Sequence, residues 1–389
     1  MTKVLFVIGQ MRIGGVSKAL LELLTCLDAN NQYEVSLLCF NQDGVFFQKV
    51  PNSIKIIPST LLLKMTENSA SDISAESARY GLIRKACSAW SKVFSKKVPA
   101  KLVTMFSGKL AEEYDCAIAY THPMEAHMFC NLGAEYVCNC VKAKKKAIFI
   151  HCDYLAYGGY GKLNNALLDR FDKIAAVSDS VGRRICEAIP RVAEKVTTVR
   201  NCHDFTAIFK MANDKPVVYG HKVNIVTVAR LSGEKGLERC ISIFVALKKE
   251  GFDVSWHLVG GGPLESRLRE KISLHHAEDY IILEGEHANS YRYMKNADYL
   301  LLPSYHEAAP MVFDEAGCLG IPIISTDTLS ARELVEERKL GLVCGKDDES
   351  LYQTIKNAVM RVYSQDKIQI DFKASNEEAL SNFTKLCGV

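Results

Sequence analysis

The feature that most constrains the fold is a repeated alternation of short apolar runs with amphipathic segments. The first run covers residues 3–8 and ends at Gly9, and after Gly15 apolar side chains recur at helical spacing. Further runs of strand length cover residues 35–40, 54–57, 116–120, 147–150 and 174–177. This alternation predicts a parallel sheet with helices on both faces.

The same pattern starts again after a polar stretch that begins near Asp204. Runs of strand length then cover residues 225–228, 254–259, 280–283, 299–302, 323–325 and 342–344. A chain of 389 residues with 48% hydrophobic residues is long enough for two ordinary globular domains. The pattern therefore predicts an α/β protein with two doubly wound, Rossmann-like domains, residues 1–204 and 205–365. In such sheets ligands bind beyond the carboxyl ends of the strands.

Several classes of protein are excluded by composition. No apolar run approaches the roughly 18 to 20 residues of a membrane-spanning helix, and the N-terminal run is too short for a secretory signal. The 14 cysteines lie scattered in apolar runs without a C-x-x-C pair, which argues against a zinc site or a disulfide framework. We expect reduced cysteines in a cytoplasmic protein.

One segment, residues 69–108, interrupts the first domain and concentrates positive charge. Residues 51–110 contain 10 basic and 3 acidic residues. Tyr80, Ile83, Cys87, Trp90 and Phe94 share one helical face. Basic side chains around such a face suit a helix on an anionic membrane, although the apolar stripe could equally pack on its own sheet. The patch predicted to contact membrane or acceptor comprises Arg84, Lys85, Trp90, Lys92, Lys96 and Lys97.

The strongest chemical motif follows the strand predicted at 299–302 and contains Glu307 and Glu315. Eight residues correspond to about 800° of helical rotation, so the two side chains would not share a helix face. Pro310 suits the first turn of a helix, which predicts Glu307 in the loop and Glu315 inside the helix. The helix N-terminus then offers free N–H groups of Met311 and Val312 to a diphosphate.

A second motif, Arg230 with Lys235 five residues later, follows the strand predicted at 225–228. Both cations can converge on one dianion and oppose the charge that develops on a leaving diphosphate. An Arg and a Lys in a loop are often only solvated surface, but their position after a strand favours the binding interpretation.

Two features of the first half are weaker on their own. His151 follows the strand predicted at 147–150 and could be a structural residue. Gly14 and Gly15 allow close backbone approach after the first strand, but the spacing is not that of the dinucleotide-binding fingerprint G-x-G-x-x-G.

The chain resembles the GT-B glycosyltransferases in the order of five features along the sequence. These are the glycine pair, His151, R-x4-K, the Val259–Pro263 segment with its three glycines, and E-x7-E. The similarity is to the large retaining family, called family four, that builds bacterial capsular, exopolysaccharide and O-antigen chains. It spans nearly the whole chain. It implies a GT-B fold, with two Rossmann-like domains facing across a cleft and the N-terminal domain on the acceptor side. We also expect a C-terminal helix, residues 366–389, to pack back on the N-terminal domain.

The resemblance also implies roles for individual residues. Arg230 and Lys235 would bind the donor diphosphate, Glu307 the transferred sugar and Glu315 the ribose. His151 and the Gly14–Gly15 loop would close the donor site from the first domain. Further donor contacts would come from Gly261, Ala309, Pro310, Met311 and Val312. Where the family commonly has Glu-Gly-Phe-Pro, this chain has Glu307-Ala-Ala-Pro310, so the approach to the donor sugar can differ.

The expected function is transfer, with retention, of a hexose or N-acetylhexosamine from a nucleotide diphosphate sugar, taken as a UDP-sugar. The acceptor would be a lipid-linked saccharide of surface polysaccharide biosynthesis at the inner face of the cell membrane. The sequence has no D-x-D triplet, so we expect neither a metal nor another cofactor. Two alternatives stay open: a non-catalytic partner subunit of another transferase, and a nicotinamide-dependent oxidoreductase, which the missing fingerprint disfavours. No recognition module accompanies the basic segment, so nucleic acid is not an expected partner.

Overall fold

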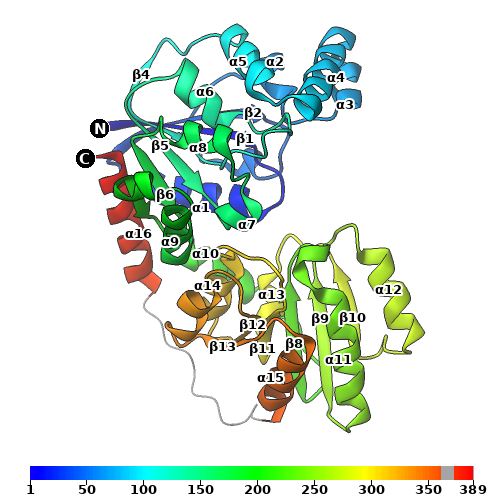
Figure 1. The fold of residues 1–389 in the computed structure, drawn as a ribbon. Coiled ribbons are helices and arrows are strands. Elements are labelled where there is room, and N and C mark those ends of the chain that lie inside the picture. Colours follow the sequence, from blue (N-terminus) through cyan, green and yellow to red (C-terminus); the bar gives the residue numbers. More distant parts are fainter. Residues whose placement is uncertain (361–371, 389) are drawn as a thin grey trace. The chain divides into compact units, whose positions relative to one another are not determined.

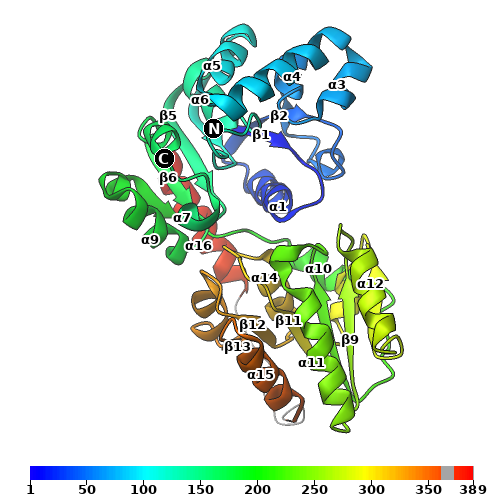
Figure 2. The ribbon, with the colours of Figure 1, turned by 45° about the vertical axis from the view of Figure 1, so that its right-hand side comes forward.

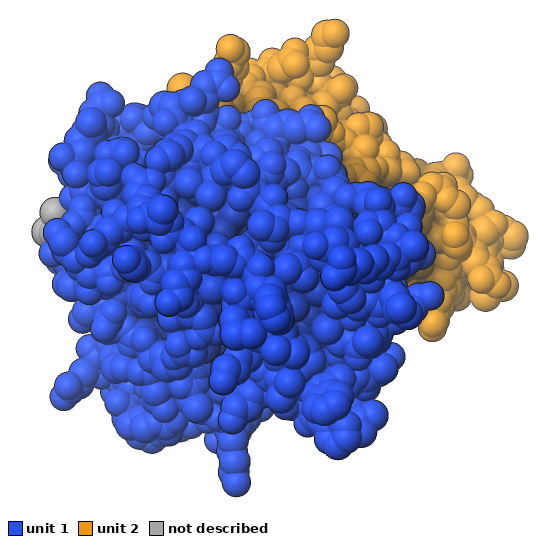
Figure 3. All heavy atoms as spheres, turned by 90° about the horizontal axis from the view of Figure 1, so that it is seen from above, with its two compact units in different colours: residues 1–203, 373–389 blue, residues 204–372 orange. Residues whose placement is uncertain are grey.

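The computed structural model describes residues 1–360 and 372–388 and divides into two compact units. Unit 1 comprises Met1–His203 together with Lys373–Val389, and unit 2 comprises Asp204–Phe372. Figure 3 colours the two units separately. Each unit contains one parallel sheet and is described here by itself.

The sheet of unit 1 has seven parallel strands in the order β3-β2-β1-β4-β5-β6-β7. Figure 1 labels β1, β2, β4, β5 and β6. The strands are β1 (Thr2–Gln10), β2 (Tyr33–Asn41), β3 (Lys55–Ile56), β4 (Glu113–Ala119), β5 (Lys142–Ile150), β6 (Lys173–Ala176) and β7 (Val196–Thr198). The inner strands are almost wholly buried because helices cover both faces. This order reverses direction between β1 and β4, as in the doubly wound nucleotide-binding folds.

Nine helices are described in the part of unit 1 before residue 204. They are α1 (Gly15–Asn30), α2 (Leu61–Lys64), α3 (Ala70–Glu76), α4 (Ala78–Val93), α5 (Lys97–Phe106), α6 (Gly133–Cys140), α7 (Tyr154–Tyr157), α8 (Lys162–Leu168) and α9 (Asp179–Ala188). The basic segment predicted at 69–108 therefore forms α3, α4 and α5.

A helix near the end of the chain, α16 (Phe372–Cys387), belongs to unit 1. The ring of Phe383 stacks on Phe6 of β1 at a centroid distance of 5.9 Å, and Thr384 hydrogen-bonds the Tyr33 hydroxyl at 2.7 Å. The side chain of Asn376 bonds both the N–H and the carbonyl of His203. Of the helix expected at 366–389, residues 366–371 and 389 lie outside the described residues.

Unit 2 contains a six-stranded parallel sheet in the order β10-β9-β8-β11-β12-β13. Its strands are β8 (Val223–Val228), β9 (Val254–Val259), β10 (Ile281–Gly285), β11 (Tyr299–Leu302), β12 (Ile323–Thr326) and β13 (Gly341–Cys344). Its described helices are α10 (Phe205–Ala212), α11 (Leu237–Lys249), α12 (Glu265–Leu274), α13 (Tyr291–Met294), α14 (Met311–Cys318) and α15 (Asp348–Met360). Figure 2 gives a second view of the helices around this sheet.

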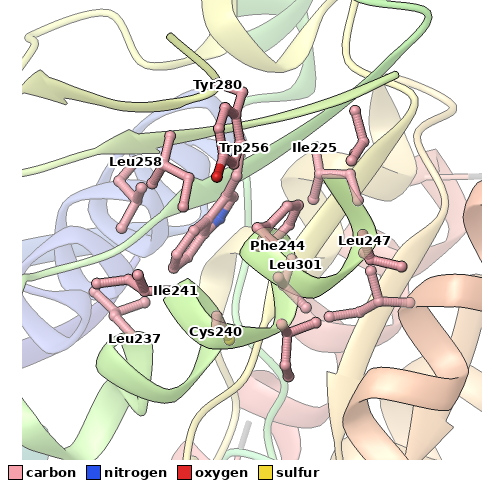
Figure 4. Close-up of a cluster of buried hydrophobic side chains, with 14 of the residues drawn as sticks. Ile225, Leu237, Cys240, Ile241, Phe244, Leu247, Trp256, Leu258, Tyr280 and Leu301 are labelled. Carbon is pink, nitrogen blue, oxygen red and sulfur yellow. The ribbon is translucent and has the colours of Figure 1, made fainter. Parts of the chain in front are cut away.

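The two faces of this sheet belong to two separate hydrophobic clusters, because neighbouring side chains of a strand point to opposite faces. Ile225 joins the cluster that contains residues of α11, α12 and α15, whereas Val226 joins the cluster with residues of α10, α13 and α14. In the first cluster the ring of Trp256 stacks on Phe244 at 4.9 Å (Figure 4). Its indole N–H donates to the hydroxyl of Thr227 at 2.9 Å, so this fully buried polar group has a partner.

The prediction of an α/β protein with two Rossmann-like domains is confirmed, and all twelve strands expected from the sequence are present. The short strand β7 was not predicted, because its three partly exposed residues carry little apolar signal. No helix among the described residues has both the length and the hydropathy needed to cross a bilayer.

Candidate functional site

Residues from both chemical motifs meet where the strand order of unit 2 reverses. Strands β8 and β11 are neighbours in the sheet, although two other strands lie between them in sequence. Arg230 and Lys235 lie in the loop after β8, and Glu307 lies in the loop after β11. Such a reversal leaves a crevice beyond the carboxyl ends of the strands, where α/β proteins bind ligands. The topology thus brings the two predicted motifs together.

Several contacts fix the β8 loop and the start of α11 against the β11 loop. The N–H of Tyr305 donates to the carbonyl of Glu234 at 2.8 Å, and the guanidinium of Arg239 donates to the carbonyl of Pro303 at 2.7 Å. Gly236 adopts a left-handed conformation, with φ of 63°, and a β-carbon there would collide with the Pro303 carbonyl. Only glycine fits this close approach without strain, which explains why Gly236 follows Lys235.

Lys235 and Glu307 form an ion pair at the centre of this site. The ammonium of Lys235 is 2.5 Å from Oε1 of Glu307, and the two side chains are only 19% and 12% exposed. The same Oε1 accepts a hydrogen bond of 2.7 Å from the hydroxyl of Ser304, which is fully buried. The carboxylate is thus held by Lys235 and Ser304 through one oxygen. Among the described residues none donates a hydrogen bond to Oε2.

The other cation, Arg230, is held less tightly. Its side chain is 69% exposed and forms a 3.0 Å ion pair with Glu234 four residues later. Ser232 also donates to Glu234, at 2.6 Å. Burial tends to raise the pKa of Glu234, but these hydrogen bonds and the charge of Arg230 together lower it below its usual value. Glu234 therefore stays ionised and restrains the exposed guanidinium.

Helix α14 begins within one residue of the start predicted from the sequence. Pro310 is its N-cap residue, so the helix starts at Met311, one residue later than a proline in the first turn would give. Glu307 lies in the preceding loop and Glu315 within the helix, as expected. The carboxyl of Glu315 belongs to a side chain that is only 2% exposed.

The glycine segment after β9 packs on the β8 loop. The N–H of Leu231 donates to the carbonyl of Gly261 at 2.9 Å, and β-carbons at Gly260 and Gly262 would collide with carbonyls of Ala229 and Leu231. The glycines are therefore explained by backbone packing within unit 2. Contact of Gly261 with a donor stays a prediction.

In unit 1 the glycine pair lies at the exposed start of α1, beyond the carboxyl end of β1. A β-carbon at Gly14 or Gly15 would meet no atom within 4 Å. Packing inside unit 1 therefore does not require these two glycines. They leave open space at the N-terminus of a 16-residue helix, a position that suits an anion.

His151 lies at the carboxyl end of β5 beside the ring of Tyr120, at a centroid distance of 4.9 Å. Burial, and then the nearby His122, lower its pKa to about 3. Burial and the charge of Lys96 likewise lower the pKa of His122 to about 4. Both rings are neutral at neutral pH. Among the described residues neither Nε2 of His151 nor Nδ1 of His122 has a hydrogen-bond partner.

Two further residues near the predicted site residues were not predicted from the sequence. Ser304 lies three residues before Glu307, but nothing in the sequence marks it as the donor to that carboxylate. Glu67 lies near the carboxyl end of β1, where its carboxylate accepts from the backbone N–H of Asn131 at 3.1 Å and would collide with a β-carbon at Gly9. Burial raises the pKa of Glu67 above its usual value. Contacts over such sequence separations leave no local pattern.

Two members of the predicted basic patch do not belong to an exposed surface. Lys96 is 0% exposed, with its ammonium 3.2 Å from Glu135 and 2.9 Å from the carbonyl of Met124. The guanidinium of Arg84 lies over the ring of Phe129 and donates to the carbonyl of Asn68. The prediction that Lys96 belongs to an exposed patch was wrong, because its side chain is buried where the chain passes from α4 to α5. Arg84 is half-buried, and its role stays a prediction. Lys85, Trp90, Lys92 and Lys97 are exposed.

Solved structures with the same architecture share little sequence with this chain. The Anabaena protein Alr3699/HepE, crystallised with UDP, superposes with a TM-score of 0.67 at 16% identity, covering 99% of this chain and 100% of that one. The lipopolysaccharide outer core galactosyltransferase WaaB superposes with a TM-score of 0.61 at 16% identity, covering 99% of each chain. The chain therefore has the GT-B fold.

Residues 211–377 match the family model described as Glycosyl transferases group 1. Relatives include WcaL of Escherichia coli K12, named for colanic acid biosynthesis, at 31% identity over 56% of this chain and 55% of that protein. The amylovoran biosynthesis glycosyltransferase AmsK of Erwinia amylovora is 31% identical over 32% of this chain and 33% of its own. The matched part of the chain thus spans about half the length of WcaL and a third of the length of AmsK. The resemblance inferred from the motifs is confirmed.

Proposed function

We propose that this protein is a glycosyltransferase of exopolysaccharide biosynthesis that transfers a hexose or N-acetylhexosamine from a UDP-sugar with retention. The observation that carries the proposal is the meeting of Arg230, Lys235 and Glu307 at the strand-order reversal of unit 2, beside the start of α14. The family of residues 211–377 and the relatives named for exopolysaccharide synthesis support it. The complex of HepE with UDP-glucose supports the choice of UDP.

The site offers complementary charge to each part of such a donor. The diphosphate would accept from Arg230, Lys235 and the N–H groups of Met311 and Val312. Glu307 would accept from sugar hydroxyls through Oε2, and Glu315 from the ribose. With these groups neutralising the diphosphate, the proposal includes no metal. Among the described residues, no three His, Cys, Asp or Glu side chains are grouped as metal ligands would be.

The proposed reaction is a front-face displacement at the anomeric carbon. The bond from that carbon to the β-phosphate oxygen breaks, and the bond to the acceptor oxygen forms on the same face. The departing phosphate accepts the acceptor's proton, so the products are the glycoside and UDP. Arg230 and Lys235 stabilise the negative charge that develops on the leaving group. The roles expected of His151 and of the Gly14–Gly15 loop stay predictions.

The acceptor in this proposal is a lipid-linked saccharide, and the protein would work at the inner face of the cell membrane. Residues 77–111 contain eight Lys or Arg and no Asp or Glu. Helices α4 and α5 expose a set of large apolar side chains: Leu82, Trp90, Val93, Phe94, Val98, Leu102, Met105 and Phe106. Apolar and basic side chains exposed together suit contact with an anionic lipid surface.

The proposal is tested by turnover of the purified full-length protein with a panel of nucleotide sugars. We expect release of UDP from one UDP-sugar, and a Lys235→Ala variant about 10²- to 10³-fold slower, because one preorganised charge is lost from the leaving group. Lys249→Ala, an exposed lysine at the far end of α11, is the matched control and should keep full activity.

Two results would contradict the proposal. Absence of turnover with every nucleotide sugar would favour a non-catalytic partner subunit. Turnover that survives in Lys235→Ala would remove the role of this lysine. Retention is checked by the anomeric configuration of the product in NMR spectra.

A further inference from the structure

Unit 1 contains a groove that the donor site does not use. It has a volume of about 810 Å³ and lies among α5, α6 and α8. Its lining includes five cations: Lys97, Lys101, Lys109, Lys162 and Arg170. Its volume falls in the range of ligand pockets, roughly 300 to 1,000 Å³.

The positive charge of this groove is not balanced by the protein. The lining contains one carboxylate, Glu135, which already pairs with the buried Lys96 at 3.2 Å. Within the described residues none of the five cations forms an ion pair. Cations gathered without counter-charges favour an anionic ligand.

One end of the groove lies at the carboxyl edge of the sheet. The buried Lys96, directly before α5, and Asn164 of α8 both donate to the carbonyl of Met124, at 2.9 Å each. Met124 lies in the loop that follows β4. Lys97 and Lys162, which begin α5 and α8, are therefore near the carboxyl edge of the unit 1 sheet, the edge at which such sheets bind ligands.

The lining also has an apolar part. It includes Ala100, Met105, Leu163, Ala166 and Leu167. A chain of hydrogen bonds crosses the floor farther along, from Arg170 to Asn139 at 2.8 Å and from Asn139 to Thr104 at 3.1 Å. Helix α5 has ten residues and so extends about 15 Å along the groove. A ligand matching this lining has an anionic head and a hydrocarbon tail.

The groove also adjoins the exposed apolar surface of the same helix. Lys97 and Lys101 are four residues apart and therefore lie on one side of α5. The adjacent side of the helix carries three exposed apolar residues at the same spacing: Val98, Leu102 and Phe106. A molecule that leaves a membrane along this apolar stripe would enter the groove directly. This continuity favours a lipid over a soluble anion.

We propose that the groove binds the lipid carrier of the acceptor, with the carrier's phosphate on Lys97, Lys101 and Lys162 and its first hydrocarbon units along α5 and α8. The saccharide would then extend beyond the carboxyl edge of the sheet. The identity of the ligand as an acceptor carrier rests on the proposed function. Its chemical class, a phosphorylated hydrocarbon, rests on the groove alone.

The test is equilibrium binding of farnesyl phosphate to the full-length protein, with farnesol and inorganic phosphate as separate probes. We expect farnesyl phosphate to bind more tightly than either. Replacing Lys97, Lys101 and Lys162 together by Ala should weaken its binding by about tenfold or more. Ala166→Trp keeps every charge but fills the groove, and should weaken binding similarly. Lys142→Ala, an exposed lysine at the start of β5, is the control.

The outcomes separate this proposal from the proposed function. Equal binding of farnesyl phosphate by the wild type and both groove variants would overturn the groove proposal, as would inorganic phosphate that binds as well as farnesyl phosphate. Hydrolysis of the UDP-sugar by the groove variants should equal that of the wild type, since water replaces the acceptor. The protein could also bind farnesyl phosphate through the groove but turn over no nucleotide sugar. That result would contradict the proposed function and the role of the ligand as acceptor carrier, but it would support a phosphorylated hydrocarbon as the ligand of the groove.

Discussion

At the scale of single residues, the pair of Lys235 and Glu307 explains how a site can be preorganised before a ligand arrives. Ser304 and Lys235 both hold Oε1 of Glu307, so neither charged side chain is free to turn into solvent. An incoming diphosphate carries more negative charge than one carboxylate and competes with Glu307 for the ammonium. The ion pair thus keeps Lys235 in place at little cost to binding.

The two buried histidines of unit 1 give a prediction about pH. Their pKa values, about 3 for His151 and about 4 for His122, lie below the ordinary value near 6.5. Between pH 6.5 and 4.5 the unfolded chain therefore binds more protons than the folded one, and stability is lost as the pH falls. Each histidine can contribute up to about 1.4 kcal/mol per pH unit to this loss.

This prediction is checked by urea unfolding of the wild type and of a variant with both His122→Gln and His151→Gln. The free energy of unfolding of the wild type should fall more steeply below pH 6.5 than that of the variant. Parallel curves for the two proteins would show that the histidines are not held neutral by the fold.

Some residues of the site could be predicted from the sequence and others could not. Arg230, Lys235, Glu307 and Glu315 were predicted because each belongs to a short motif directly after a strand. Ser304 and Glu67 act through contacts that depend on the tertiary fold, so no local pattern marked them. Lys96 was misplaced for a related reason: it lies where the chain leaves α4 and begins α5, and there its side chain turns toward Glu135.

At the scale of elements, α4 and α5 are the least conventional part of the molecule. Trp90 and Phe94 lie on the helical face that was a candidate for packing on the sheet, but both are exposed and pack on each other at 4.7 Å. A surface with large apolar and basic side chains, yet without an acidic residue, suits an anionic bilayer.

Removing positive charge from α4 tests this surface without touching the groove. Replacing Arg79, Lys85 and Lys92 by Ala should weaken binding to vesicles containing phosphatidylglycerol by about two orders of magnitude at low salt, since each cation contributes about 1 kcal/mol. The measurement is vesicle co-sedimentation, and added salt should reduce the difference.

The matched control replaces Lys49, Lys142 and Lys249, three exposed lysines elsewhere, and so makes the same change in net charge. It should bind vesicles almost as well as the wild type. If both triple variants lose binding equally, net charge rather than the α4 surface attracts the membrane.

At the scale of the whole molecule, the chain builds the same strand order twice. Both sheets contain the order 3-2-1-4-5-6, with one further strand at the edge in unit 1. The sequence predicted the two parallel sheets, because parallel strands buried on both faces leave continuous apolar runs, but it did not predict the order of their strands. It could not predict which loops meet, since neighbouring strands β8 and β11 are more than 70 residues apart in sequence.

The central claim is that unit 2 holds the donor diphosphate at the reversal between β8 and β11. The most direct measurement is a crystal structure of the protein soaked with UDP. We expect electron density for the diphosphate within hydrogen-bond distance of Arg230, Lys235 and the start of α14, with the ribose near Glu315. Density for UDP at any other place on the molecule, with this site left empty, would contradict the claim.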